Sequence, residues 1–163
     1  MRPRTQGTSL RRDFRVVMSR LRFALLDASD SESTRRNFRR ELDADLAEFD
    51  VDDGDLPPHF EWDGVVITGS RASVYWEDEQ GWIRPLVDWV AEAVDRDVPV
   101  LGVCYGHQVL AEALGGTVEH MGEYELGYRQ VTHGGDPLFD GVDETFTVFV
   151  SHQDRVTELP PDA

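Results

Sequence analysis

The sequence has a single cysteine and no lysine, and both shortages limit the classes of protein to which it can belong. One cysteine cannot form an intramolecular disulfide framework or a Cys-x-x-Cys metal cluster. An unpaired thiol is typical of proteins in a reducing compartment. Long apolar runs are lacking too, since no stretch approaches the ~20 residues that a membrane-spanning helix needs. We therefore expect a cytoplasmic protein that uses neither a metal nor another cofactor and has no contact with a membrane.

Positive charge is scarce as well. All 16 basic residues are arginines, and the 32 acidic residues bring the net charge to −16. A chain of this charge repels nucleic acid and anionic membranes, so neither is expected as a partner. An acidic chain without lysine is typical of salt-loving organisms and predicts a halophilic archaeal source, with GC-rich codon usage plus ordinary acidity as the alternative.

The arginines are concentrated at the amino terminus. Residues 1–40 carry 11 arginines and only four acidic residues, and apolar periodicity begins only at Phe23. We interpret residues 1–20 as a disordered basic extension, with Met18 as a possible true start, and residues 21–163 as one domain.

Apolar runs, helical spacing and turn residues predict strands that alternate with helices. The first strands are expected at Arg22–Asp27, Leu46–Val51, Gly64–Thr68 and Val98–Val103. Helices are expected at Ser31–Leu42, Trp82–Val94 and 107–114. Later strands are expected at Thr117–His120, Tyr128–Thr132 and Thr145–Val150, followed by a loop over Ser151–Ala163. This alternation is typical of an α/β protein with a mostly parallel central sheet flanked by helices.

Cys104 stands where the apolar run 98–103 ends and a helical pattern begins. Glycines lie two residues away on either side, at Gly102 and Gly106. A nucleophile on a sharp strand-to-helix turn needs small neighbours, because the turn is strained and the substrate approaches the backbone closely. The helix start behind the sulfur adds partial positive charge, which favours the thiolate. The pattern therefore predicts a reactive cysteine and acyl-transfer chemistry, with a buried inert thiol as the alternative.

The segment Gly102-Val-Cys-Tyr-Gly-His-Gln108 resembles the nucleophile motif of class I glutamine amidotransferases. Three more segments resemble the family in the same order along the chain: Val66-Ile-Thr-Gly-Ser70, Glu125-Leu-Gly127 and Val150-Ser-His-Gln-Asp-Arg-Val156. The last of these, followed by Leu159-Pro160, is similar to the branch that contains GMP synthase. The resemblance extends from about residue 21 to residue 163 and implies a flavodoxin-like α/β fold.

The resemblance also implies a reaction, in which cysteine attacks the side-chain amide of L-glutamine, releases ammonia and leaves a γ-glutamyl thioester for water to cleave. Cys104 is the expected nucleophile, and the backbone N–H groups of Gly69 and Tyr105 are the expected oxyanion hole. The residues expected to bind the substrate are Gln108, Ser151 and His152. Ammonia would pass to a synthetase subunit or domain, which would also carry any ATP chemistry because the sequence has no Gly-x-x-x-x-Gly-Lys loop.

The general base of this family belongs to a His-Pro-Glu motif, which the sequence does not contain. A structural histidine is the simpler interpretation of both His107 and His152, so neither is expected to replace that base. The resemblance thus implies a domain incomplete at its carboxyl end, with little activity of its own. Two alternatives stay open: a non-catalytic glutamine-binding domain that pairs with a synthetase, and a hydrolase of γ-glutamyl peptides.

Overall fold

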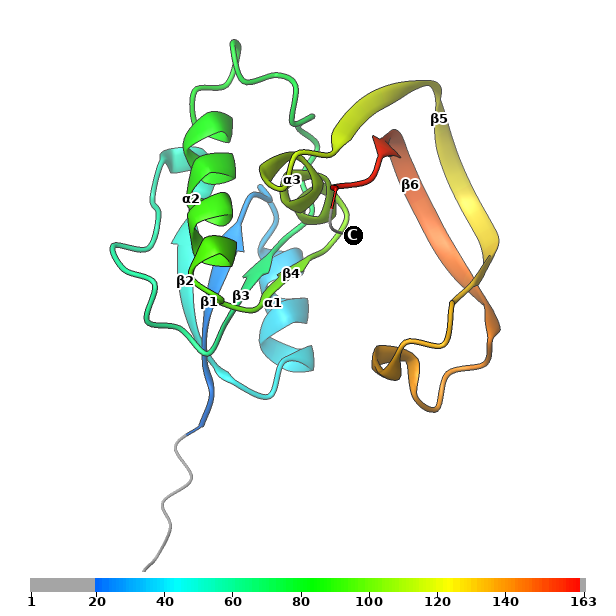
Figure 1. Ribbon diagram of the computed structural model, residues 1–163, viewed down its shortest axis with the longest axis horizontal. Helices are drawn as coiled ribbons and strands as arrows, with labels where there is room; N and C mark the ends of the chain where they lie inside the picture. The colour runs from blue at the N-terminus through cyan, green and yellow to red at the C-terminus, as the bar shows by residue number, and fades with distance from the viewer. Residues whose placement is uncertain (1–19, 162–163) are drawn as a thin grey trace, which may run out of the picture.

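The computed structural model describes residues 20–161, which form a parallel four-stranded sheet beside a long antiparallel hairpin (Figure 1). The sheet has the order β2-β1-β3-β4 and consists of β1 (Arg22–Asp27), β2 (Asp45–Asp50), β3 (Gly64–Ile67) and β4 (Val100–Gly102). The helices are α1 (Glu32–Glu41), α2 (Ile83–Asp95) and α3 (Tyr105–Ala113). The hairpin strands are β5 (Thr117–Thr132) and β6 (Thr145–Glu158), and short 3-10 turns lie at Val51–Asp53 and Pro137–Phe139. The predicted α/β fold with a parallel central sheet is confirmed.

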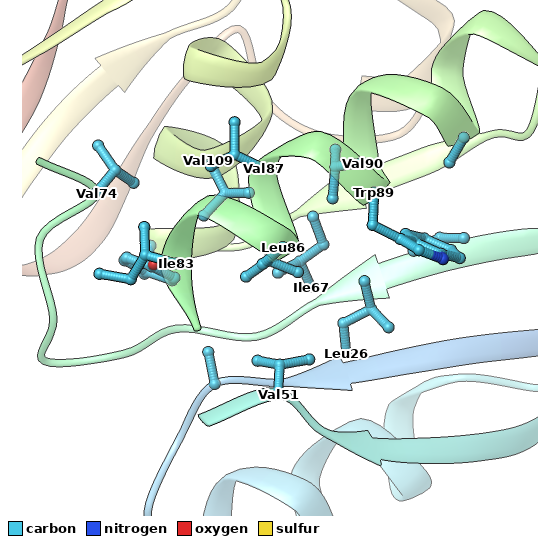
Figure 2. Close-up of a cluster of buried hydrophobic side chains, with 14 of the residues drawn as sticks. Leu26, Val51, Ile67, Val74, Ile83, Leu86, Val87, Trp89, Val90 and Val109 are labelled. Carbon is cyan, nitrogen blue, oxygen red and sulfur yellow. The ribbon is translucent and has the colours of Figure 1, made fainter. Parts of the chain in front are cut away.

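The main core lies between the sheet and the two helices α2 and α3, while α1 lies on the opposite side of the sheet (Figure 2). Leu26 of β1 and Ile67 of β3 are paired in register and fully buried on the α2 side. The apolar side chains of α2 recur three and four residues apart, which gives the helix one buried stripe. The buried members of this stripe are Ile83, Leu86, Val87, Trp89, Val90 and Ala93.

Parallel pairing places the carboxyl ends of β1, β3 and β4 at one edge of the sheet. The loops that leave these ends begin at Ala28, Thr68 and Val103, and they therefore meet above the sheet. β4 is the outer strand on its side among residues 20–161, and Leu101 on it is 48% exposed. The edge where the three loops meet is where the predicted reactive cysteine lies.

The hairpin corrects the expectation for the carboxyl-terminal part of the chain. A loop over Ser151–Ala163 is wrong for residues 151–158, which continue β6 and pair with residues 117–126 of β5. The two short strands predicted for residues 117–132 are one long strand with a register shift between His120 and Glu125. The apolar pattern missed these parts because their inward-facing groups are polar, such as His152 and Asp154.

The predicted basic extension and the alternative start at Met18 fall almost entirely on residues 1–19, which lie outside the described residues. Within residues 20–161, no helix combines the length and the apolar composition required to cross a membrane.

Candidate functional site

Cys104 occupies a strained turn between β4 and α3. Its backbone has φ 56° and ψ −109°, a left-handed conformation that a residue with a Cβ adopts only where the surroundings impose it. The side chain is exposed, and the residue lies directly before the first turn of α3. An exposed side chain on a strained strand-to-helix turn is accessible to a substrate, so the position is suited to a nucleophile.

The two glycines around Cys104 are required by close packing. A Cβ on Gly102 would lie 2.3 Å from the carbonyl oxygen of Gly106, and a Cβ on Gly106 would lie 2.5 Å from the carbonyl oxygen of Ile67. Real Cβ atoms do not approach backbone oxygens this closely, so the turn tolerates no side chain at either position. The first turn of α3 therefore rests directly on the end of β3.

Backbone amides lie beside the sulfur. A Cβ on Gly69 would be 3.8 Å from Cys104 Sγ, so the Gly69 backbone passes next to the thiol. Among the hydrogen bonds of residues 20–161, none is donated by the backbone N–H of Gly69, Ser70 or Tyr105. Free N–H groups beside a nucleophile are suited to stabilise negative charge that develops on a carbonyl oxygen next to the sulfur. Sequence analysis singled out Gly69 and Tyr105 but missed Ser70.

A cavity of about 460 Å³ opens beside Cys104, between the loop after β3, the start of α3 and the hairpin. Five of the six predicted site residues line it, namely Cys104, Tyr105, Gln108, Ser151 and His152. Gly69 instead lines a neighbouring cavity of about 540 Å³ together with Cys104. Ser70, Arg71 and Ala72 line both cavities, so the loop after β3 separates the two spaces.

The imidazole of His152 is held by a glutamate from the other hairpin strand. His152 Nε2 lies 2.7 Å from Glu125 Oε2, and Arg129 donates to the second oxygen of the same carboxylate. These hydrogen bonds from His152 and Arg129 lower the pKa of Glu125, because both stabilise its charged form. The ring of His152 is thereby oriented by Glu125, while His107 is exposed and lines neither of these cavities.

Asp154 joins the hairpin to the loop after β3. Its carboxylate is only 4% exposed and accepts hydrogen bonds from Ser73 Oγ at 2.5 Å and from Tyr75 Oη at 2.7 Å. Burial raises the pKa of Tyr75, so this hydroxyl remains a donor at neutral pH. Sequence analysis missed all three residues as site residues; only Asp154 carried a signal, because it belongs to one of the segments that resemble the amidotransferase family.

Replacing Asp154 with asparagine is expected to lower the free energy of unfolding by about 1–3 kcal/mol, because one buried hydroxyl then loses its charged acceptor. Urea unfolding followed by circular dichroism measures the change. Glu123→Gln is the matched control, since Glu123 is an exposed acidic residue of the same hairpin. Equal stabilities of the two variants would show that Asp154 does not hold the hairpin in place.

Within the described part of the chain, no group of three or more histidine, cysteine, aspartate and glutamate side chains has an arrangement that suits a metal ion.

Comparisons with known proteins show which families and structures the chain is similar to. Residues 26–163 match the family model described as glutamine amidotransferase class-I. The chain is 35% identical over 136 residues to a glutamine-hydrolysing GMP synthase of Aromatoleum aromaticum, which covers 78% of this chain and 25% of that protein. It is 43% identical over 122 residues to a glutamine-hydrolysing GMP synthase from Burkholderia mallei. This match covers 69% of this chain and 21% of that protein.

A solved structure supports the fold. A glutamine amidotransferase from Thermotoga maritima superposes with a TM-score of 0.73 at 22% identity, over 87% of this chain and 64% of that one. The chain thus spans a quarter or less of the two GMP synthases named above and about two thirds of this solved relative.

Proposed function

Since the chain belongs to the class I glutamine amidotransferase family, we propose that Cys104 attacks the side-chain amide of L-glutamine and releases ammonia. The observation that carries the proposal is the exposed, left-handed Cys104 beside three free backbone amides and a cavity of about 460 Å³. That volume is sufficient for one amino acid of the size of glutamine.

The proposed reaction has two steps. The thiolate sulfur bonds to the side-chain carbonyl carbon, the C–N bond breaks, and the nitrogen leaves as ammonia after it gains a proton. Water then attacks the γ-glutamyl thioester and the C–S bond breaks. L-Glutamate is released, and the thiol of Cys104 is regenerated. Both steps pass through a tetrahedral oxyanion, which the amides of Tyr105 and of Gly69 and Ser70 are placed to stabilise.

The walls of the cavity supply the groups that would hold the substrate. Gln108 lies one turn beyond Cys104 on α3 and is buried, so its amide offers a fixed donor and acceptor. We propose that the backbone at Ser151 and His152 contacts the α-amino and α-carboxylate groups, and that the pair of His152 with Glu125 keeps this strand in position. Arg71 brings a positive charge to the same cavity and is suited to the α-carboxylate.

The ammonia-accepting partner is inferred from the relatives. The relatives in Aromatoleum aromaticum and Burkholderia mallei are described as glutamine-hydrolysing GMP synthases, and the chain spans only a small part of each. We propose that this chain delivers ammonia to a synthetase subunit or domain. The 163 residues contain no His-Pro-Glu motif, so we expect them to turn glutamine over slowly by themselves, because proton delivery to the departing nitrogen lacks its histidine.

Protection of Cys104 from iodoacetamide tests the proposal without requiring turnover. L-Glutamine is expected to slow alkylation of the single thiol in a saturable way, whereas L-glutamate and D-glutamine are expected to protect weakly. Mass spectrometry of the intact chain follows the reaction. Stronger protection by γ-glutamyl peptides than by L-glutamine would favour the γ-glutamyl hydrolase instead, and no protection by either would contradict the proposal.

Replacing Arg71 with alanine is expected to raise the L-glutamine concentration that gives half-maximal protection by about tenfold, which corresponds to the loss of one charge-assisted hydrogen bond. Arg84→Ala is the control, because Arg84 is an exposed arginine on α2 that lines neither cavity beside Cys104. Unchanged protection in the Arg71 variant would remove this residue from the binding site.

A further inference from the structure

Behind the free amides of the site, two polar side chains are sealed inside the protein. Asp27 at the end of β1 is 1% exposed, and Thr68 at the end of β3 is fully buried. Thr68 Oγ1 donates to Asp27 Oδ1 at 3.0 Å and accepts from the backbone N–H of Ala28 at 2.9 Å. The same hydroxyl also lies 3.1 Å from the carbonyl oxygen of Gly69, which is a second acceptor. A buried hydroxyl with these three contacts ties the ends of the two strands to the Gly69–Ser70 turn.

The carboxylate of Asp27 is itself fixed. It accepts from the backbone N–H of Ser29 at 3.0 Å and from Ser29 Oγ at 2.7 Å, and its second oxygen pairs with Arg35 Nε. Arg35 comes from α1 and also reaches Asp50 of β2 at 2.8 Å. A charge buried to this extent persists only when it is paired and hydrogen-bonded, and here every contact also restricts its position.

The same Thr68 contacts the nucleophile turn through its backbone. Its carbonyl oxygen accepts from the N–H of Gly106 at 3.1 Å, and Gly106 lies two residues after Cys104. The peptide group that contains this carbonyl also contains the N–H of Gly69, and a peptide group is planar. The peptide plane between Thr68 and Gly69 is therefore fixed at two points. Gly106 holds its carbonyl oxygen, and Asp27 holds the side chain of Thr68.

Continuing from the proposed function, on which this step rests, we propose that Asp27 and Thr68 are positioning residues for the oxyanion hole. Together they set where the Gly69–Ser70 turn leaves β3, and so where its free amides lie relative to Cys104 Sγ. Neither side chain is among the residues that line the cavities on either side of this turn, so their effect on the reaction passes through the turn. The hydroxyl of Thr68 links the carboxylate of Asp27 to this turn.

The test compares two reactions of the same thiol in the 163-residue chain. The γ-nitrophenyl ester of L-glutamate acylates Cys104 through a tetrahedral oxyanion: the sulfur–carbonyl bond forms, the ester C–O bond breaks, and nitrophenolate leaves without needing a proton. Iodoacetamide alkylates the same sulfur by displacement of iodide and forms no oxyanion. A misplaced amide therefore slows the first reaction and leaves the second unchanged.

Thr68→Val keeps the shape of the side chain and removes the hydroxyl. It is expected to lower the acylation rate at saturating ester by roughly 10- to 100-fold, with the half-saturating ester concentration and the iodoacetamide rate unchanged. Thr68→Ser, which restores the hydroxyl, is expected to recover most of the acylation rate. Thr68→Ala repeats the comparison should the valine variant fail to fold by circular dichroism.

Three outcomes would overturn the inference. An acylation rate in Thr68→Val equal to that of the unaltered chain would show that the hydroxyl does not position the turn. Equal slowing of acylation and alkylation would indicate a general disturbance of the thiol. Failure of the ester to acylate the unaltered chain, with iodoacetamide still reacting, would overturn the proposed function itself, which distinguishes that failure from the other two.

Discussion

Cys104→Ala is expected to abolish formation of γ-glutamyl thioester and every release of ammonia from L-glutamine, whether the chain acts alone or with a synthetase partner. The sequence contains no second cysteine, so no other thiol can take over the attack. A serine hydroxyl is a much weaker nucleophile than a cysteine sulfur, so Cys104→Ser is expected to be inactive as well. Ammonia release measured against a buffer blank quantifies the loss.

Binding serves as the control for this variant. Alanine removes only the sulfur from a side chain that is exposed and makes no hydrogen bond among those of residues 20–161. Isothermal titration with L-glutamine is therefore expected to give an affinity close to that of the unaltered chain. Undiminished ammonia release by Cys104→Ala would contradict the assigned nucleophile, whereas lost binding would show that the variant had disturbed the cavity as well.

Gly106→Ala is expected to destabilise the protein by about 3 kcal/mol or more and to remove the reactivity of the thiol together with the fold of the turn. The added methyl would meet the carbonyl oxygen of Ile67 at 2.5 Å and the Cβ of the same residue at 2.7 Å. Both atoms belong to a buried central strand, so the contact is relieved only if α3 moves away from β3.

Gly134→Ala is the matched control for this prediction, because a Cβ at that position would meet no atom within 4 Å. Urea unfolding of the two variants measures the difference in stability, and the rate of iodoacetamide alkylation reports on the turn. A Gly106 variant as stable as the Gly134 variant would mean that α3 does not rest on β3 as closely as the structure shows.

The central strands β1 and β3 could be predicted from sequence because they are largely buried and are therefore short apolar runs. Gly64–Thr68 was expected as a strand, and β3 is Gly64–Ile67. The turn at Cys104 could be predicted for a related reason, since two glycines around a lone cysteine at a strand-to-helix boundary are typical of a tight nucleophile turn. Both signals are local in the chain.

The groups that escaped prediction depend on contacts between distant segments. Asp27 and Thr68 are 41 positions apart, and Ser73 and Asp154 are 81 apart, so no periodicity connects them. β6 was expected to end at Val150 because its continuation is polar, and its pairing with β5 became visible only in the structure. The disordered extension, the cytoplasmic location, the halophilic source and the incomplete carboxyl end stay predictions.

The most direct test of the chemistry assigned to Cys104 is to search for the covalent intermediate. The chain is mixed with the γ-nitrophenyl ester of L-glutamate, whose leaving group needs no proton, quenched in acid and analysed by mass spectrometry of the intact protein and of its peptides. We predict a mass increase of one γ-glutamyl group on the peptide that contains Cys104, which is removed by hydroxylamine and absent from Cys104→Ser. A chain that binds L-glutamine but shows no such adduct, or carries it on another residue, would contradict the assignment.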